Sequence, residues 1–78
     1  MPTRSDIDRG GRREALRLAV EHLAELDRRI RALELRIEFE RGHGNDCEHP
    51  ERLLEIFRRS FDLVEHRRAV ILSEIANR

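Results

Sequence analysis

The residues best suited to chemistry gather in one polar segment, Gly42 to His49. His43, Cys47 and His49 lie close together in this segment, and imidazole and thiolate groups are ligands of zinc, copper and nickel. Structural zinc sites pair their ligands at characteristic spacings, and here a fourth ligand would have to come from a nearby carboxylate or a second chain. We therefore expect a polar turn and no cofactor, with these three residues as the candidates for a metal-responsive module.

A second grouping places a glutamate before a histidine twice, as Glu21-His22 and Glu65-His66. Carboxylates and histidines that face one another from packed helices form di-iron sites. Those sites use Glu-x-x-His, in which both side chains project from one face, whereas adjacent residues diverge by about 100° on a helix. We expect these four residues on a solvated face. Because the sequence has no nucleophile–base pair and no phosphate-binding loop, we expect no enzymatic activity.

Arginine is the only cationic residue type apart from histidine. The 16 arginines are balanced by 16 acidic residues, which gives a net charge of zero, and tryptophan and tyrosine are absent. Affinity for nucleic acid comes from neutralised phosphates and stacked bases, so this composition favours a protein partner over nucleic acid. A nucleic-acid-binding hairpin dimer that uses paired arginines remains the alternative function. The pairs are Arg12-Arg13, Arg28-Arg29, Arg58-Arg59 and Arg67-Arg68.

Two amphipathic helices must carry these residues, and the first is predicted over residues 12–41. Its apolar residues alternate at spacings of three and four, the a/d pattern of a helix packed along one seam. Gly42 is expected to end this helix in the left-handed conformation, and residues 42–49 to form the loop. Residues 1–11, which contain Gly10-Gly11, are expected to form a flexible arm. The seam is Leu16, Ala19, Leu23, Leu26, Ile30, Leu33 and Ile37.

A second helix is predicted from Pro50 to about Ala76, because proline suits the first turn. A loop this short makes the helices antiparallel, and the numbers of facing residues then add up to about 91. Apolar residues face one another at each level tested: Ile37 with Leu54, Ile30 with Phe61, and Leu16 with Ile75. Ile56, Leu63 and Val70 widen the apolar face of this helix beyond what one neighbour covers.

The predicted fold is therefore all-α, an antiparallel helical hairpin of two long helices. A chain of 78 residues with one cysteine builds only a thin core and has no internal disulfide. We expect it to dimerise into a four-helix bundle of coiled-coil type. No apolar run approaches the ~20 residues that a membrane span needs, and a single cysteine fits a reducing compartment, so we expect a cytoplasmic protein without a membrane partner.

The expected function is protein binding, as an adaptor, a regulator or an accessory subunit that acts as a homodimer. Leu35 and Phe39 lie one turn apart and outside the seam, near the flank of the second helix that carries Ile56. A contiguous apolar patch of this kind usually contacts something. The patch is expected either to be buried by the second copy of the dimer or to bind a helix of another protein.

Arg68 has a different role, because it interrupts the apolar stripe between Val64 and Ile71, opposite Leu23. Its aliphatic stem is expected along the seam, and a buried guanidinium would need a carboxylate such as that of Glu21 or Glu65. Polar interruptions of this kind specify register and partner choice in coiled coils, at a cost in stability. We therefore assign Arg68 to structural specificity and not to catalysis.

Overall fold

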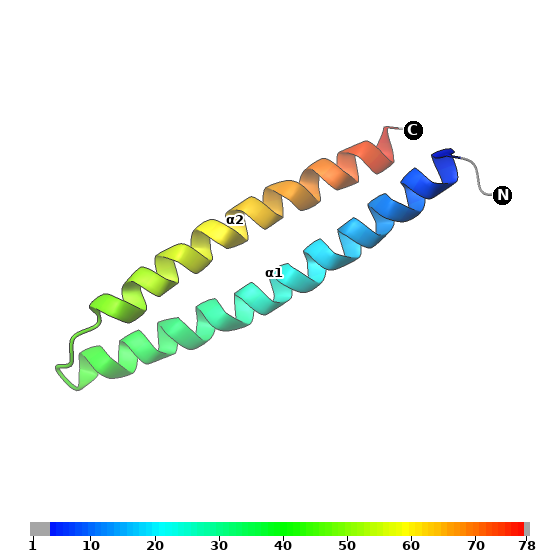
Figure 1. Ribbon diagram of the computed structural model, residues 1–78. Coiled ribbons are helices and arrows are strands. Elements are labelled where there is room, and N and C mark those ends of the chain that lie inside the picture. Colours follow the sequence, from blue (N-terminus) through cyan, green and yellow to red (C-terminus); the bar gives the residue numbers. More distant parts are fainter. Residues whose placement is uncertain (1–3, 78) are drawn as a thin grey trace.

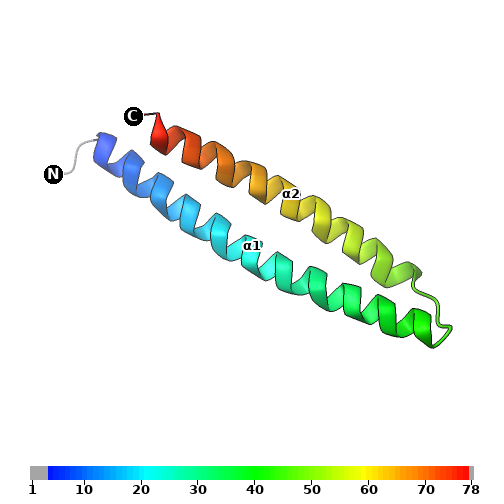
Figure 2. The same cartoon turned by 180° about the vertical axis from the view of Figure 1, so that it is seen from behind.

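The computed structural model describes residues 4–77, with side chains from residue 10 onward, and these residues form two helices and no strand. Helix α1 spans Arg4–Gly42 and helix α2 spans Glu48–Ala76. The helices lie side by side and antiparallel, joined by one short loop (Figure 1), and the view from behind shows the same arrangement (Figure 2). The hairpin is elongated, 63 × 19 × 15 Å. The predicted all-α helical hairpin is confirmed.

Helix α1 starts earlier than predicted. It is already helical at Arg4 and continues through Gly10 and Gly11, where a flexible arm was expected up to residue 11. A glycine inside a helix costs only about 1 kcal/mol relative to alanine, and the long run of helix-forming residues after Gly11 outweighs that cost. The first three residues of the expected arm lie outside the described residues.

The end of α1 is set by Gly44, and the prediction that Gly42 takes the left-handed conformation is wrong. Gly44 has a φ of 70° and follows the helix by two residues. Its amide donates to Arg41 O at 3.1 Å, and the amide of Asn45 donates to Glu40 O at 2.9 Å. These two bonds form a Schellman motif, which satisfies carbonyl groups that the helix end leaves open.

Helix α2 begins at Glu48, two residues before the predicted Pro50. The side chain of Cys47, the residue before the helix, makes no capping hydrogen bond. Asp46 Oδ1 instead accepts a hydrogen bond from the Glu48 amide at 3.0 Å, which supplies one of the acceptors that a helix start lacks. Pro50 therefore lies in the first turn, where the missing amide hydrogen costs nothing.

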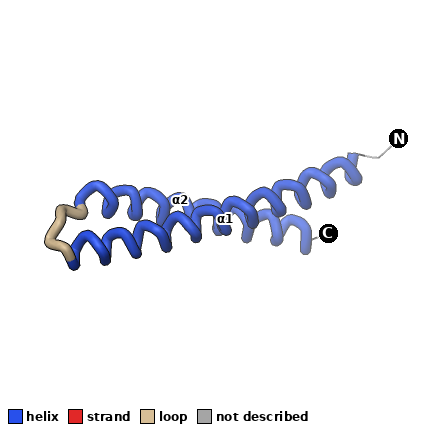
Figure 3. Tube along the Cα trace, turned by 90° about the horizontal axis from the view of Figure 1, so that it is seen from below, coloured by secondary structure: helices blue, strands red, loops and turns tan. Residues whose placement is uncertain are grey.

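The core is a single seam between the helices. Its buried cluster is formed by Leu33, Ile37, Cys47 and Leu54, so the predicted pairing of Ile37 with Leu54 is confirmed. The helices cross at a shallow angle when seen from below (Figure 3). None of the described residues has a large side chain that is completely buried. In residues 4–77 neither helix has a stretch long and apolar enough to cross a bilayer.

Candidate protein-binding surface

Ion pairs between the two helices lie along one long edge of the hairpin. Arg41 forms an ion pair with Glu51 near the loop, and Arg58 Nη2 lies 3.8 Å from Glu34 Oε1 further along. On this side, charged residues of both helices line a groove along the seam. We call this side the ion-paired edge. The charged side chains of this edge are well solvated by water.

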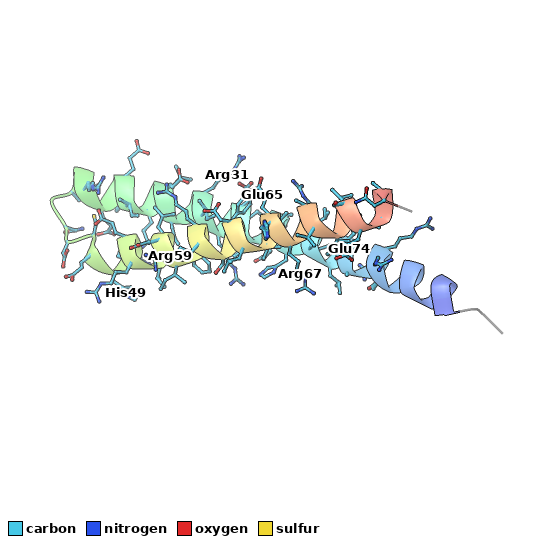
Figure 4. All side chains as sticks on the ribbon, turned by 90° about the horizontal axis from the view of Figure 1, so that it is seen from above. Arg31, His49, Arg59, Glu65, Arg67 and Glu74 are labelled. Carbon is cyan, nitrogen blue, oxygen red and sulfur yellow. The ribbon has the colours of Figure 1, made fainter. Side chains whose placement is uncertain are left out.

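The opposite edge is more apolar. A shallow hollow there is lined by Ala15, Leu18 and His22 of α1 and by Val64 and Arg67 of α2, so these residues share one side of the hairpin. Figure 4 shows the two sides directly: Arg31 and Glu65 project to one edge, and Arg67 to the other. We call the side of Leu18 and Arg67 the open edge.

A row of apolar residues runs along α2 on the open edge. Ile56, Leu63 and Val70 repeat every seven residues, the interval at which side chains share a helix face. Their side chains are 56%, 71% and 42% exposed in the single chain, which agrees with the prediction that they widen the apolar face beyond what one neighbour covers. His49 begins the same heptad row and projects to the same side as Arg67 (Figure 4). We call Ile56, Leu63 and Val70 the second stripe.

The predicted partner-binding residues are all exposed. Leu35 and Phe39 of α1 are 67% and 59% exposed, and Ile56 belongs to the second stripe. The Phe39 ring lies against the ring of His43, with centroids 4.1 Å apart. Leu35 lies in a shallow depression whose other lining residues are charged. Each of these three apolar side chains is therefore exposed on the surface of the single chain.

Arg68 is half-buried on the seam side of α2, as predicted. Its Nε is buried and has no hydrogen-bond partner among the described residues. Glu21 and Glu65 were the two carboxylates expected to pair with the Arg68 guanidinium. Glu21 instead accepts a hydrogen bond from Arg17 Nη1 at 2.6 Å, and Glu65 is exposed. Arg68 therefore interrupts the apolar seam without a compensating ion pair from the described stretch of the chain.

The three loop candidates for metal binding face different surroundings. The His43 ring nitrogen lies 2.8 Å from Phe39 O, and His49 is exposed. Cys47 is buried in the core cluster, where its thiol donates to Ile37 O at 3.7 Å. Within residues 10–77, no three histidine, cysteine, aspartate or glutamate side chains are grouped closely enough to hold a metal ion.

The glutamate–histidine pairs lie on exposed surface, as predicted. Glu21, His22, Glu65 and His66 are all exposed. Their neighbour Glu25 bonds two arginines of its own helix instead of turning toward α2. Each helix therefore neutralises its charges largely within itself.

Two glutamates of α1 have lowered pKa values for this reason. Hydrogen bonding by Arg17 lowers the pKa of Glu14 below its ordinary value. Hydrogen bonds from Arg28 and then Arg29 lower the pKa of Glu25. The pKa of Arg17 is raised in turn, chiefly by its bond to Glu14. These groups are ordinary ion-paired surface residues.

Sequence reasoning missed some of the exposed apolar surface. Leu18 and Val20 of α1 and Leu72 of α2 are exposed, although none was predicted to lie on a binding surface. The seven-residue spacing of the second stripe is visible in the sequence, where it predicted an apolar face wider than one neighbour covers. Comparison of the chain with protein families, with curated proteins and with solved structures found no match.

Proposed function

We propose that this chain is a small non-enzymatic protein-binding module, an adaptor, a regulator or an accessory subunit, that acts as a homodimer through the apolar faces of its helices. One observation carries the proposal. Eight large apolar side chains are between 42% and 71% exposed, while none of the described large side chains is completely buried. Exposed apolar surface on this scale is typical of interaction sites.

The arginines support a protein partner over nucleic acid. Members of three of the four arginine pairs are engaged with carboxylates: Arg12 with Glu74, Arg28 and Arg29 with Glu25, Arg58 with Glu34, and Arg59 with Glu55. An arginine held by a carboxylate is less free to displace counterions from a phosphate backbone. Binding of RNA or DNA that weakens steeply with salt would instead favour the alternative.

The patch of Leu35 and Phe39 is where a partner helix would bind. Apolar residues one turn apart on a helix are typical anchors in the binding of a second amphipathic helix. The double substitution Leu35→Gln, Phe39→Gln removes both anchors and keeps helix-forming residues. Arg36→Gln, on the same helix and exposed, is the matched control.

Sedimentation and affinity capture test the proposal together. We expect the wild type and Arg36→Gln to sediment as dimers and to retain one stoichiometric protein. The double variant should remain a folded dimer and lose that protein. Dissociation of the double variant would mean that the patch belongs to the dimer interface. A compact, cooperatively folded wild-type monomer with no bound protein would contradict the proposed function.

A further inference from the structure

The apolar row on the open edge is symmetric about its central residue. On α2, Ile56 and Val70 lie seven residues to either side of Leu63. The second stripe therefore presents apolar residues at the same three positions when the direction of its helix is reversed. The corresponding row of α1 is interrupted by Glu25, which lies seven residues after Leu18.

The centre of the second stripe can be placed relative to α1. In the half of the hairpin nearer the loop, facing residues are identified by the ion pairs Arg41–Glu51 and Glu34–Arg58, whose numbers add up to 92 in each case. By this register Leu63 is level with Arg29. A rotation by 180° about an axis through this level, perpendicular to the helices, therefore superposes the second stripe on itself.

We propose that a second copy of the chain covers the open edge, with α2 antiparallel to the partner's α2 and the two loops at opposite ends. The two-fold axis passes beside Leu63. Leu63 then contacts the partner's Leu63, and Ile56 contacts the partner's Val70. A two-fold interface must be self-complementary, and the second stripe meets this condition. This arrangement rests on the homodimer of the proposed function and specifies its interface.

The other two-fold arrangement, with both loops at one end, matches the surfaces less well. It lays α1 on the partner's α2 in the register of the hairpin. Leu63 would then face the partner's Arg29, and Ile56 would face the partner's Arg36. Apolar residues would thus meet guanidinium groups at two levels, and the antiparallel α2 arrangement avoids this.

The charge nearest the proposed axis is already compensated. Arg29 donates from Nε to Glu25 Oε1 at 3.0 Å, and its guanidinium carbon lies 5.9 Å from the centroid of the Phe57 ring. Arg29 and the partner's Arg29 therefore each approach the axis already paired with a glutamate of their own chain, which reduces the repulsion between the two guanidinium groups.

The exposed area fits an interface of ordinary size. The hairpin exposes 6280 Å². A compact monomer of its mass, 9.3 kDa, exposes roughly 5,000 Å². The excess is larger than the ~800 Å² per partner that a standard interface buries. A second copy on the open edge would remove an area of this size.

Disulfide cross-linking tests the position of the axis. In a Cys47→Ser background, Leu63→Cys places two thiols beside the axis, within the short Cα separation that a disulfide requires. Leu35→Cys is the matched control, because Leu35 and Leu63 are similarly exposed in the single chain, 67% and 71%. At about 10 µM protein, Leu63→Cys should form cross-linked dimer about 100-fold faster than Leu35→Cys, because its effective thiol concentration is millimolar.

A spin-label distance gives a second measurement that needs no covalent bond. His49 is exposed, lies near the loop and is 14 residues from Leu63. With a label on His49→Cys, the two labels of a dimer should be roughly 40 Å apart, since each helix rises 1.5 Å per residue on either side of the axis. If Cys47→Ser does not fold, both experiments are done with the buried native Cys47 in place. The wild-type protein, which lacks the added cysteine, then gives the background cross-linking and labelling that are subtracted.

The outcomes separate this inference from the proposed function. Rapid cross-linking of Leu63→Cys together with the long distance supports the antiparallel arrangement. A dimeric mass with slow cross-linking of Leu63→Cys, or with labels on His49→Cys closer than about 25 Å, overturns this arrangement and leaves the homodimer in place. A monomeric mass under the same conditions overturns both.

Discussion

Arg12 donates from Nε to Glu74 Oε2 at 3.1 Å and so joins the beginning of the long seam to the last turns of α2. The two residues are 62 positions apart in the sequence. They lie at the end of the hairpin that has no loop, where the helices are held together only by side chains. The ion pair therefore opposes separation of the two helices at the end without the loop.

Glu74→Gln should lower the free energy of unfolding by about 0.2–1 kcal/mol, the usual value of a partly exposed ion pair. The loss should shrink in 1 M salt, where screening acts over about 3 Å. Urea unfolding at low and high salt measures both effects. Glu65→Gln, which changes an exposed glutamate of the same helix, is the control and should have little effect. An equal loss in both variants would mean that the interhelical bond contributes nothing.

Gly10→Ala and Gly11→Ala should each stabilise the protein by about 0.5–1 kcal/mol and increase its helix content, because both positions lie inside α1. An added Cβ meets no atom within 4 Å at either position. Gly44→Ala is the contrasting control: its φ of 70° strains any residue with a side chain, and this variant should be destabilised. Circular dichroism during thermal unfolding measures all three variants. Unchanged helicity in the first two would contradict the start of α1 at Arg4.

The sequence predicted the helices and the seam because these depend on a repeated pattern. Seven apolar positions in α1 agree on one face, and in α2 the single exception, Arg68, does not obscure the apolar stripe. The ends of the helices depend on one or two residues each. Gly42 and Gly44 are chemically identical, and only the hydrogen bonds of the folded turn show that Gly44 takes the left-handed conformation.

What covers the second stripe could not be predicted from the sequence, for another reason. Ile56, Leu63 and Val70 have the residue types and the spacing of a buried row. Whether such a row is covered depends on a neighbour, and one hairpin supplies a neighbour only for the main seam. The same pattern is thus consistent with burial in an assembly and with exposure in the single chain.

The pH dependence of stability should include a contribution from Glu25. Its pKa is lowered in the folded state, first by the hydrogen bond from Arg28 and then by that from Arg29. A lowered folded pKa means that the contribution is present above the ordinary value of 4.5 and is lost as the pH falls through the folded value. The melting temperature of the wild type should exceed that of Glu25→Gln at pH 7. The difference should stay constant down to about pH 4.5 and disappear at more acid pH. A difference that persists at pH 2, or one that Glu65→Gln reproduces, would argue against this cause.

Arg68→Leu should stabilise the protein. The buried Nε of Arg68 has no hydrogen-bond partner in the described stretch of the chain, and an unsatisfied buried donor costs about 1–3 kcal/mol. Leucine at this position continues the apolar seam and removes that cost.

Urea unfolding at one fixed protein concentration measures the gain, since the stability of an associating protein depends on concentration. Arg59→Leu, at an exposed position, is the control and should change stability by less than about 0.5 kcal/mol.

A second readout tests whether Arg68 specifies the assembly. If the polar interruption selects one register, its removal should permit others, and Arg68→Leu should sediment as a mixture of species where the wild type gives one. A single species with raised stability would limit the role of Arg68 to a local cost. A loss of stability above about 1 kcal/mol would mean that the guanidinium satisfies a charged network that only the assembled protein contains, because removing one member of such a network leaves an uncompensated charge.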